Sequence, residues 1–222
     1  MEKWFIGAAI GQRYIEGAGT KQEADARDFK NWIIKDTDDS MPLWLTKVSI
    51  TPDMKIALSN SSIGSLFKCL INREKPLDPV EQIKIGYYDN ADEPPEEHHI
   101  FPTRFCIDHI PGWNTEVESN DHALNICPLG SRTNRKWDKM DPKNQIIDIK
   151  YAIPNDTRRK EILDKLFLSE ECISILERSP KKTTDYYDFL DKRFKVFLEK
   201  LEYWDFKIGT EDYFNDPSVD IT

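Results

Sequence analysis

The order of segments in the middle of the chain constrains the fold more than any other feature. Residues 98–101 suit a short strand, and Leu124–Leu129 suits a second strand after a long loop. Ser131 is a good N-cap for a helix that follows directly, which places Asn134 in the first helical turn. A strand, a loop, a strand and a helix in this order can bring His98 and Asn134 into one small site.

Helical periodicity dominates the rest of the chain, where apolar residues recur at near-helical spacing in six stretches. Leu43–Leu58 alternates poorly and contains Pro52, so we expect a loop with short extended pieces there. The sequence therefore predicts an α+β, mainly helical protein. The stretches expected to be helices are Trp4–Ile15, Gln22–Ile34, Ile63–Asn72, Arg158–Leu168, Ser169–Arg178 and Thr184–Trp204.

Size and composition allow these elements to pack without a membrane segment. Of the 222 residues 39% are hydrophobic, and six Trp, eleven Phe and eight Tyr supply large core side chains. No apolar run approaches the ~20 residues that cross a bilayer, and the first residues lack the apolar core of a signal peptide. We therefore expect a cytoplasmic protein with no membrane partner. Its regions would be helices at 1–88, a strand and helix core at 89–145 and helices at 146–222, packed as one compact unit.

Charge is unevenly distributed along the chain. The net charge of −9 argues against indiscriminate coating of nucleic acid, because such binding rests on neutralising phosphates. Residues 130–160 nevertheless hold nine Lys and Arg against four Asp. Such clusters are most often solvated helix faces, but the position beside the central motif favours a role in nucleic-acid binding. The acidic stretch Asp89–Glu97, which contains Pro94 and Pro95, is expected to be a linker or a solvated loop.

The side chains of the central segment suit phosphodiester hydrolysis. That reaction needs an activated water, a grip on the phosphate and stabilisation of the leaving oxygen. A strand-borne imidazole can take a proton near neutral pH. Asn134 can supply a neutral oxygen ligand to a cation, and Arg135 or Lys136 can meet the flanking phosphates.

Two motifs, His-His-Ile-Phe-Pro at 98–102 and Thr-Asn-Arg at 133–135, together resemble the HNH (ββα-metal) nuclease superfamily. The nine-residue step from Asn125 to Asn134 matches the HNH domains of RNA-guided CRISPR nucleases. The resemblance implies that His99 is the general base and that Asn125 orients the site. It implies that His98 and Asn134 bind the metal, and that a ββα-metal core is embedded between N-terminal and C-terminal helices.

A closer similarity is to the C-terminal nuclease half of GmrSD-type and SspE-type restriction enzymes, which defend bacteria against modified phage DNA and carry the same two motifs. Trp4–Tyr14 and Phe189–Arg193 also look like that family's flanking helices. The resemblance implies a DNA endonuclease in restriction or antiphage defence whose products carry 5′-phosphate and 3′-hydroxyl ends. The basic residues expected to bind DNA beside the motif are Arg132, Arg135, Lys136 and Lys139.

The chain departs from that family in two respects. A ParB-like nucleotide-hydrolysing domain precedes the nuclease there, and neither its signature nor a Gly-x-x-x-x-Gly-Lys-Ser/Thr loop occurs here. We therefore expect either a fragment or a nuclease subunit with a separate ParB-like partner. His98 stands where many HNH enzymes have Asp, and imidazole suits Mn²⁺, Ni²⁺, Co²⁺ or Zn²⁺ better than Mg²⁺. The expected cofactor is Mg²⁺ or Mn²⁺, with Ni²⁺ or Zn²⁺ as further candidates, and Mn²⁺ should support activity at least as well as Mg²⁺.

Other interpretations remain open at this stage. A catalytically silent ββα module would keep the basic stretch and bind nucleic acid or a partner protein without cleaving anything. An RNase or toxin nuclease would use the same motif, because the motif reads phosphodiester chemistry more than sugar identity. A structural zinc site would need closely spaced ligand pairs, whereas the four cysteines stand singly and are expected to be buried free thiols; these are Cys69, Cys106, Cys127 and Cys172.

Overall fold

The structure is a computed structural model that describes residues 2–35, 41–50, 61–204 and 206–208. The fold is α+β and mainly helical, as the sequence predicts. Packing divides the chain into two compact units, residues 1–54 with 201–222 and residues 55–200. Within the described ranges no helix combines the length and the apolarity needed to span a membrane.

The first unit contains three helices and a pair of two-residue strands among its described residues. Asp25 is buried in this unit and accepts hydrogen bonds from Arg13, at 2.6 and 2.8 Å, and from the Tyr14 hydroxyl, at 2.7 Å. The parallel strand pair joins the two ends of the unit's sequence. The elements are α1 (Glu2–Ile10), α2 (Ala18–Lys35), α3 (Leu43–Thr46), β1 (Ser49–Ile50) and β4 (Lys207–Ile208).

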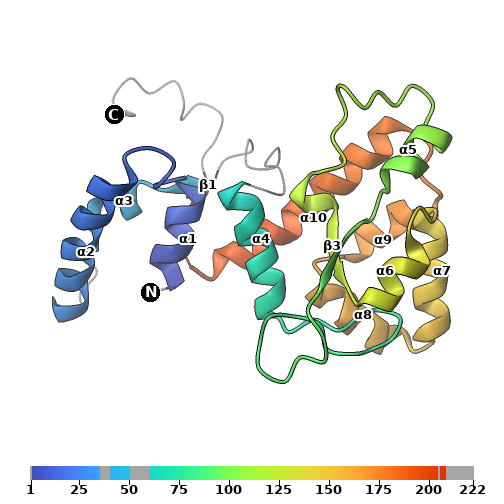
Figure 1. Cartoon of the computed structure of the whole chain (residues 1–222), viewed down its shortest axis with the longest axis horizontal. Helices are drawn as coiled ribbons and strands as arrows, with labels where there is room; N and C mark the ends of the chain where they lie inside the picture. The colour runs from blue at the N-terminus through green and yellow to red at the C-terminus, as the bar shows by residue number, and fades with distance from the viewer. Residues whose placement is uncertain (1, 36–40, 51–60, 205, 209–222) are drawn as a thin grey trace. The chain divides into compact units, whose positions relative to one another are not determined.

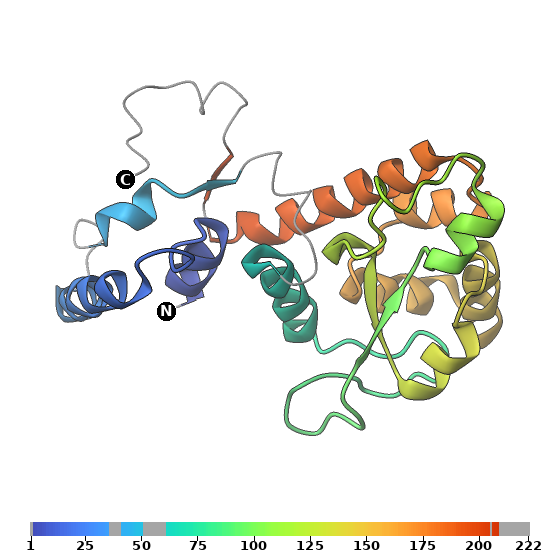
Figure 2. The same ribbon diagram turned by 45° about the horizontal axis from the view of Figure 1, so that its top comes forward.

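The second unit holds the central motif. An antiparallel strand pair lies in the middle of this unit, with α4 on one side and α6 and α7 on the other (Figures 1 and 2). Nearly all of α10 also belongs to this unit. The elements are α4 (Ser62–Arg73), β2 (Glu96–His99), α5 (Thr103–His109), the 3₁₀ turn η3 (Ala123–Asn125), β3 (Ile126–Leu129), α6 (Ser131–Trp137), α7 (Pro142–Ala152), α8 (Asp156–Lys165), α9 (Glu170–Glu177) and α10 (Thr183–Glu202).

A buried arginine from α10 holds the back of this strand pair. Arg193 is 0% exposed, and its NH1 donates to the carbonyls of Leu124 and Ile126, both at 2.8 Å. The same guanidinium donates to Leu166 O at 2.9 Å and Phe167 O at 3.3 Å. Backbone carbonyls at helix and strand ends are strong acceptors, so one side chain ties the start of β3 to the end of α8.

Helices cover most of each of the six stretches predicted to be helical. The structure adds α5 and α7, which the periodicity argument missed. Leu43–Thr46 is a short helix instead of the predicted loop, Ser49–Ile50 is extended as predicted, and residues 51–58 lie outside the described ranges.

The cysteine prediction needs one correction. All four cysteines are free, and three of them are buried, as predicted. Cys69 is exposed because the buried face of α4 carries Ile63, Leu66 and Leu70, which leaves residue 69 on the opposite side of the helix.

Candidate active site

The two predicted strands and the helix after them occur in the expected order, but the first strand lies two residues earlier than expected and the connection predicted to be a long loop contains α5 and η3. In the antiparallel pair, His98 lies opposite Cys127 and His99 lies opposite Ile126. Side chains alternate along a strand, so His98 and His99 face opposite sides of the ribbon. Glu96, two residues before His98, therefore shares the side of the ribbon that faces α6.

His98 and Asn134 meet at the junction of β2 and α6. His98 Nδ1 lies 2.9 Å from Asn134 Oδ1, and the imidazole is only 4% exposed. The indole ring of Trp137 packs edge-on against the imidazole, with 5.6 Å between ring centroids. The two side chains predicted to be metal ligands are thus adjacent.

Two further side chains fix this pair. The Asn134 amide nitrogen donates to Glu96 Oε2 at 2.7 Å, which turns Asn134 Oδ1 toward His98. On the other side of the ring, Gln145 Nε2 from α7 lies 3.3 Å from His98 Nε2 and donates to Ile100 O and Met140 O. Because an amide oxygen only accepts, His98 carries its proton on Nδ1 and donates it to Asn134 Oδ1, while the two amide hydrogens of Gln145 go to the Ile100 and Met140 carbonyls.

Burial sets the charge state of this imidazole. Desolvation lowers the pKa of His98 to about 4, although the hydrogen bond to Asn134 opposes the shift. The ring is therefore neutral at physiological pH. A neutral imidazole is the form that binds a metal ion, so the protonation state is compatible with a ligand role.

The donor set fits a divalent ion that shares its coordination shell with water and phosphate. Donor atoms on neighbouring positions about 2.1 Å from one ion lie about 3 Å apart, which is close to the separation of His98 Nδ1 and Asn134 Oδ1; these two atoms would bind an ion together only with the ring proton moved from Nδ1 to Nε2. Within the described ranges no group of three or more His, Cys, Asp or Glu side chains is arranged to hold a metal. Mg²⁺ is commonly held by one or two carboxylates with water and substrate phosphate, whereas this pair offers an imidazole and an amide oxygen, a set that suits Mn²⁺ better.

His99, on the opposite side of the ribbon, has an enclosed nitrogen without a partner. Its Nε2 is buried, and no hydrogen-bond partner for it occurs in the described part of the chain. Burial lowers the pKa of His99, while the carboxylates of Asp121 and Glu97 oppose that shift. A neutral imidazole whose nitrogen lacks a partner suits a base that meets its partner only when water and substrate arrive.

Asn125 is a positioning residue. Among the described residues, no hydrogen bond joins its side chain to His98 or Asn134. It is 0% exposed, its Oδ1 accepts from Phe101 N at 2.9 Å, and its Nδ2 donates to Phe101 O and Asn120 O. These bonds close the base of the long loop and fix the chain directly after β2. Asn125 therefore sets the position of the histidine-bearing strand.

The start of α6 differs from the prediction. Gly130 occupies the N-cap position instead of Ser131, and remote carboxylates satisfy the free N–H groups of the first turn. Asp78 accepts from Gly130 N and Thr133 Oγ1, both at 2.8 Å, while Glu93 accepts from Ser131 N at 2.8 Å. Asp78 is 0% exposed and also accepts from two backbone N–H groups of its own loop, so that loop anchors the helix that carries Asn134.

The same contacts correct the view of the acidic stretch at 89–97 as a linker or solvated loop. Glu93 holds α6, Glu96 orients Asn134, and Glu97 pairs with Lys68 at 2.6 Å. Asp92 accepts from Lys84 N at 2.7 Å. The carboxylates thus bind protein donors, and the last two residues of the stretch begin β2.

The basic residues expected to bind DNA fall into two groups. Arg132 pairs with Glu81 at 3.1 Å, and Lys136 pairs with Asp148 at 2.7 Å. Arg135 and Lys139 are exposed and form no ion pair within the described ranges. Most of the remaining basic residues between 143 and 160 are also paired, so the local excess of positive charge is largely neutralised; these pairs involve Lys150, Arg158, Arg159 and Lys160.

Three residues of the site were missed by the sequence argument. Glu96 follows from strand alternation, because residues two apart share a face, once the strand is started at the correct residue. Gln145 was within reach, since Asp141 as N-cap and Pro142 at the first helical position indicate the start of α7. Asp78 lies 52 residues from Gly130, and no local signal connects the two.

Comparisons with known proteins add no assignment to this geometry. Neither a family model, nor a curated protein, nor a solved structure matches the chain.

Proposed function

We propose that this protein is a metal-dependent endonuclease of the HNH (ββα-metal) kind that hydrolyses DNA phosphodiester bonds. The observation that carries the proposal is the approach of His98 Nδ1 to Asn134 Oδ1, at 2.9 Å, where a strand pair meets a helix. The next residue, His99, supplies a neutral imidazole with an unpartnered nitrogen. Neither the His98–Asn134 contact nor the imidazole of His99 would indicate a function alone. Their combination in one strand and helix unit favours phosphodiester chemistry.

His98 and Asn134 would hold the divalent ion, Mn²⁺ or Mg²⁺, which supplies positive charge against the scissile phosphate and the leaving oxygen. His99 Nε2 is enclosed on the other side of the ribbon, so its role as base requires that this nitrogen and the ion come to face the same phosphate when DNA binds; it would then take a proton from the attacking water. The water oxygen bonds to phosphorus as the bond to the 3′ oxygen breaks, and the 3′ oxygen takes up a proton from solvent. The products carry a 5′-phosphate and a 3′-hydroxyl. Glu96 orients Asn134, Asn125 holds the strand that carries both histidines, and the exposed Arg135 and Lys139 contact flanking phosphates.

The biological setting proposed from the motif resemblance is restriction or antiphage defence. The net charge of −9 opposes tight unassisted binding to DNA, and pairing of Arg132 and Lys136 with carboxylates reduces the basic surface further. A partner, such as a ParB-like nucleotide-hydrolysing subunit or domain, would then target the nuclease. Salt-resistant DNA binding by the isolated chain would contradict this part of the proposal.

A specific observation supports the second candidate, a silent binding module. His98, Asn134, Glu96 and Gln145 form hydrogen bonds with one another, so the cluster is also satisfied as a purely structural network. The two candidates differ in one measurable property, because only the nuclease needs a divalent ion and His99.

The test is nicking of a supercoiled plasmid by the full chain in MnCl₂, with His99→Ala beside wild type. Loss of the general base should lower the rate by about 100-fold or more. His109→Ala is the matched control, because His109 is exposed and lies outside the site, and this variant should cut like wild type. Folding of each variant is checked by its thermal unfolding midpoint. Cleavage by His99→Ala at the wild-type rate would overturn the assignment of the base.

A second arm separates DNA from RNA substrates. The same proteins are incubated with matched single strands and duplexes of deoxyribose or ribose sugar. Cleavage of deoxyribose strands supports the DNA endonuclease, since the 2′-hydroxyl takes no part in the proposed step. Cleavage restricted to ribose strands would favour the RNase alternative.

A further inference from the structure

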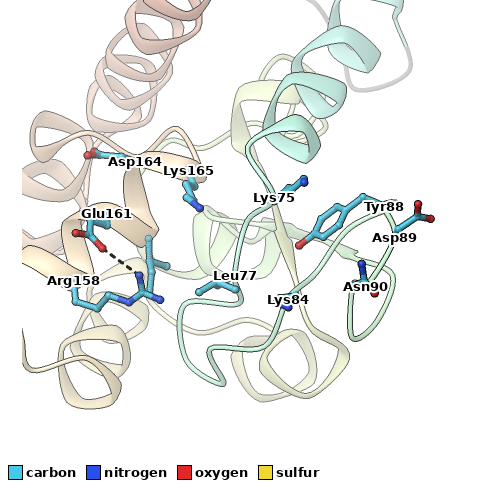
Figure 3. A pocket seen from close by; sticks show the side chains of 11 residues that line it. Lys75, Leu77, Lys84, Tyr88, Asp89, Asn90, Arg158, Glu161, Asp164 and Lys165 are labelled. Carbon is cyan, nitrogen blue, oxygen red and sulfur yellow. Dashed lines mark hydrogen bonds and ion pairs between the residues drawn. The ribbon is translucent and has the colours of Figure 1, made fainter.

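A second hollow lies away from the strand pair, between α8 and the segment 75–90 (Figure 3). Its volume is about 550 Å³, which falls in the range of small-ligand sites. Both walls belong to the second unit. The segment 75–90 is held internally by Asp78 N to Ile83 O at 2.9 Å and Ile85 N to Pro76 O at 3.2 Å, so this wall is built into the fold.

Three lysines line the hollow without a carboxylate partner in the described ranges: Lys75, Lys84 and Lys165. The Arg158 guanidinium is also present and pairs with Glu161 at 3.1 Å. In Figure 3 the carboxylates of Asp89 and Asp164 point away from the basic groups, one on each side of the hollow. The lining as a whole holds four basic side chains against three carboxylates, a small positive excess in a protein whose net charge is −9.

The same hollow has an apolar part. Leu77 and the ring of Tyr88 line the hollow from the segment 75–90 (Figure 3), and Ile162 lines it from α8. The Tyr88 hydroxyl donates to Pro76 O at 3.3 Å, which fixes the ring. Aromatic and aliphatic surfaces of this kind contact the ring or the sugar of a nucleoside, while lysines contact phosphate as point charges.

Lys75, at the rim of the hollow, has a left-handed backbone conformation. Lys75 directly follows the C-cap of α4 and has a φ of +51°, in the left-handed region that favours glycine. A lysine at this position is less stable than glycine would be, because its Cβ is crowded there. A left-handed residue at this position is a common way for a helix to end, and here it places the ammonium-bearing side chain of Lys75 at the rim of the hollow.

We propose that this hollow binds a phosphorylated nucleoside, with the phosphate on the lysines and the base or sugar on Tyr88, Leu77 and Ile162. The ligand is either a free nucleotide or the phosphorylated end of a nucleic-acid strand, since both present the same chemistry. The proposal goes beyond the nuclease function and does not need His98, His99 or a metal ion.

The test is isothermal titration calorimetry of the full chain, in EDTA and at low salt. The probes are 5′-deoxyadenosine monophosphate and a thymidine tetranucleotide with a 5′-phosphate. Deoxyadenosine and the 5′-hydroxyl tetranucleotide are the matched controls, and each should bind at least tenfold more weakly than its phosphorylated form. Binding of the mononucleotide identifies a free nucleotide as sufficient, whereas binding of the phosphorylated tetranucleotide alone identifies a strand end.

Variants separate this hollow from other basic surfaces. Lys84→Ala and Lys165→Ala should each weaken binding by about tenfold, since each removes one charged contact to phosphate. Lys150→Ala, whose lysine pairs with Glu177 elsewhere, and Asn134→Ala, in the candidate active site, should bind like wild type. Lys75→Gly should weaken binding while its free energy of unfolding stays equal to or above that of wild type, which excludes misfolding as the cause.

Three results would overturn the proposal. These are the absence of saturable binding of either phosphorylated probe to folded wild-type protein, equal binding of deoxyadenosine and its monophosphate, and unchanged affinity in both Lys84→Ala and Lys165→Ala. None of them bears on plasmid cleavage, so failure here is distinguishable from failure of the proposed nuclease.

Discussion

The candidate active site and the hollow beside α8 are both polar, but they are built on opposite principles. Around His98, nearly every polar side chain bonds to another, and Asn134, Glu96 and Gln145 form a closed network. Around the hollow, lysines stand without carboxylate partners in the described ranges. A closed network fixes geometry before the ligand arrives, whereas unpaired charge supplies attraction and leaves geometry to the ligand. The difference suggests a site for chemistry and a site for binding.

Breaking the network at its oxygen ligand should have the largest effect. Asn134→Ala removes the proposed ligand and should lower Mn²⁺-dependent plasmid nicking by 100-fold or more, and Glu96→Gln, which weakens its support, by about 10- to 100-fold. Initial nicking rates at several Mn²⁺ concentrations measure both effects. Tyr151→Ala, which removes an 88% exposed side chain on α7, serves as the control. Equal rates in Asn134→Ala and this control would contradict a ligand role for Asn134.

Releasing the anchor of α6 should come next. Asp78→Asn replaces a buried carboxylate that accepts four hydrogen bonds, and should lower the free energy of unfolding by about 2–3 kcal/mol. Glu81→Gln, in the same loop, breaks only the exposed pair with Arg132 and should cost less than about 1 kcal/mol. Urea unfolding of both variants checks this difference. Similar losses in the two would show that Asp78 does not anchor the helix.

Acid should weaken the second unit through a buried histidine that carries no charge when folded. Burial lowers the pKa of His122 to about 4, and its Nδ1 accepts from Leu124 N at 3.1 Å. Below its ordinary pKa of 6.5 the unfolded chain takes up a proton that the folded chain refuses until about pH 4. The free energy of unfolding should therefore fall as pH falls from 6.5 to 4, by at most about 1.4 kcal/mol per pH unit for this group.

His122→Asn tests that source of acid sensitivity, because asparagine keeps an acceptor at the start of η3 and does not titrate in this range. Unfolding curves in EDTA between pH 4 and 7 should show a shallower slope in this variant than in wild type. The exposed His109→Asn provides the comparison and should keep the wild-type slope. An unchanged slope in His122→Asn would show that His122 is not a source of the acid sensitivity.

The smallest expected effect lies at the hollow. Lys75→Gly should raise the free energy of unfolding by about 1 kcal/mol or less, because glycine adopts the left-handed backbone without a Cβ clash. Thermal unfolding measures the change. A clear loss of stability would mean that contacts of the Lys75 side chain stabilise the fold by more than its left-handed backbone destabilises it.

The sequence predicted the parts of the site that depend on local pattern. A strand that includes His98, a strand that ends at Leu129 and a helix that bears Asn134 all follow from short-range signals, although the first strand was predicted two residues too late. The structure brings His98 and Asn134 together as expected. The N-cap at Ser131 was wrong because carboxylates distant in sequence, Asp78 and Glu93, satisfy the helix start instead. A local capping rule has no access to such partners.

The sequence also did not predict which basic side chains would pair with carboxylates. The window at 130–160 is basic in sequence, yet six of its nine basic residues pair with carboxylates, and four of these pairs join different segments of the chain, as with Lys150 and Glu177. The unpaired cations at the hollow come instead from two segments about 80 residues apart, Lys84 and Lys165. Neither set follows from counting charges in a window, since proximity in the fold decides which charges remain free.

The most direct test of the central claim is conversion of supercoiled plasmid by the wild-type chain in EDTA, Mg²⁺ or Mn²⁺, with folding checked in each buffer. A metal-dependent nuclease should give nicked or linear product only with a divalent ion, and at least as much with Mn²⁺ as with Mg²⁺. Equal cleavage in EDTA, or no cleavage by folded protein with either ion, would contradict it and favour the silent binding module.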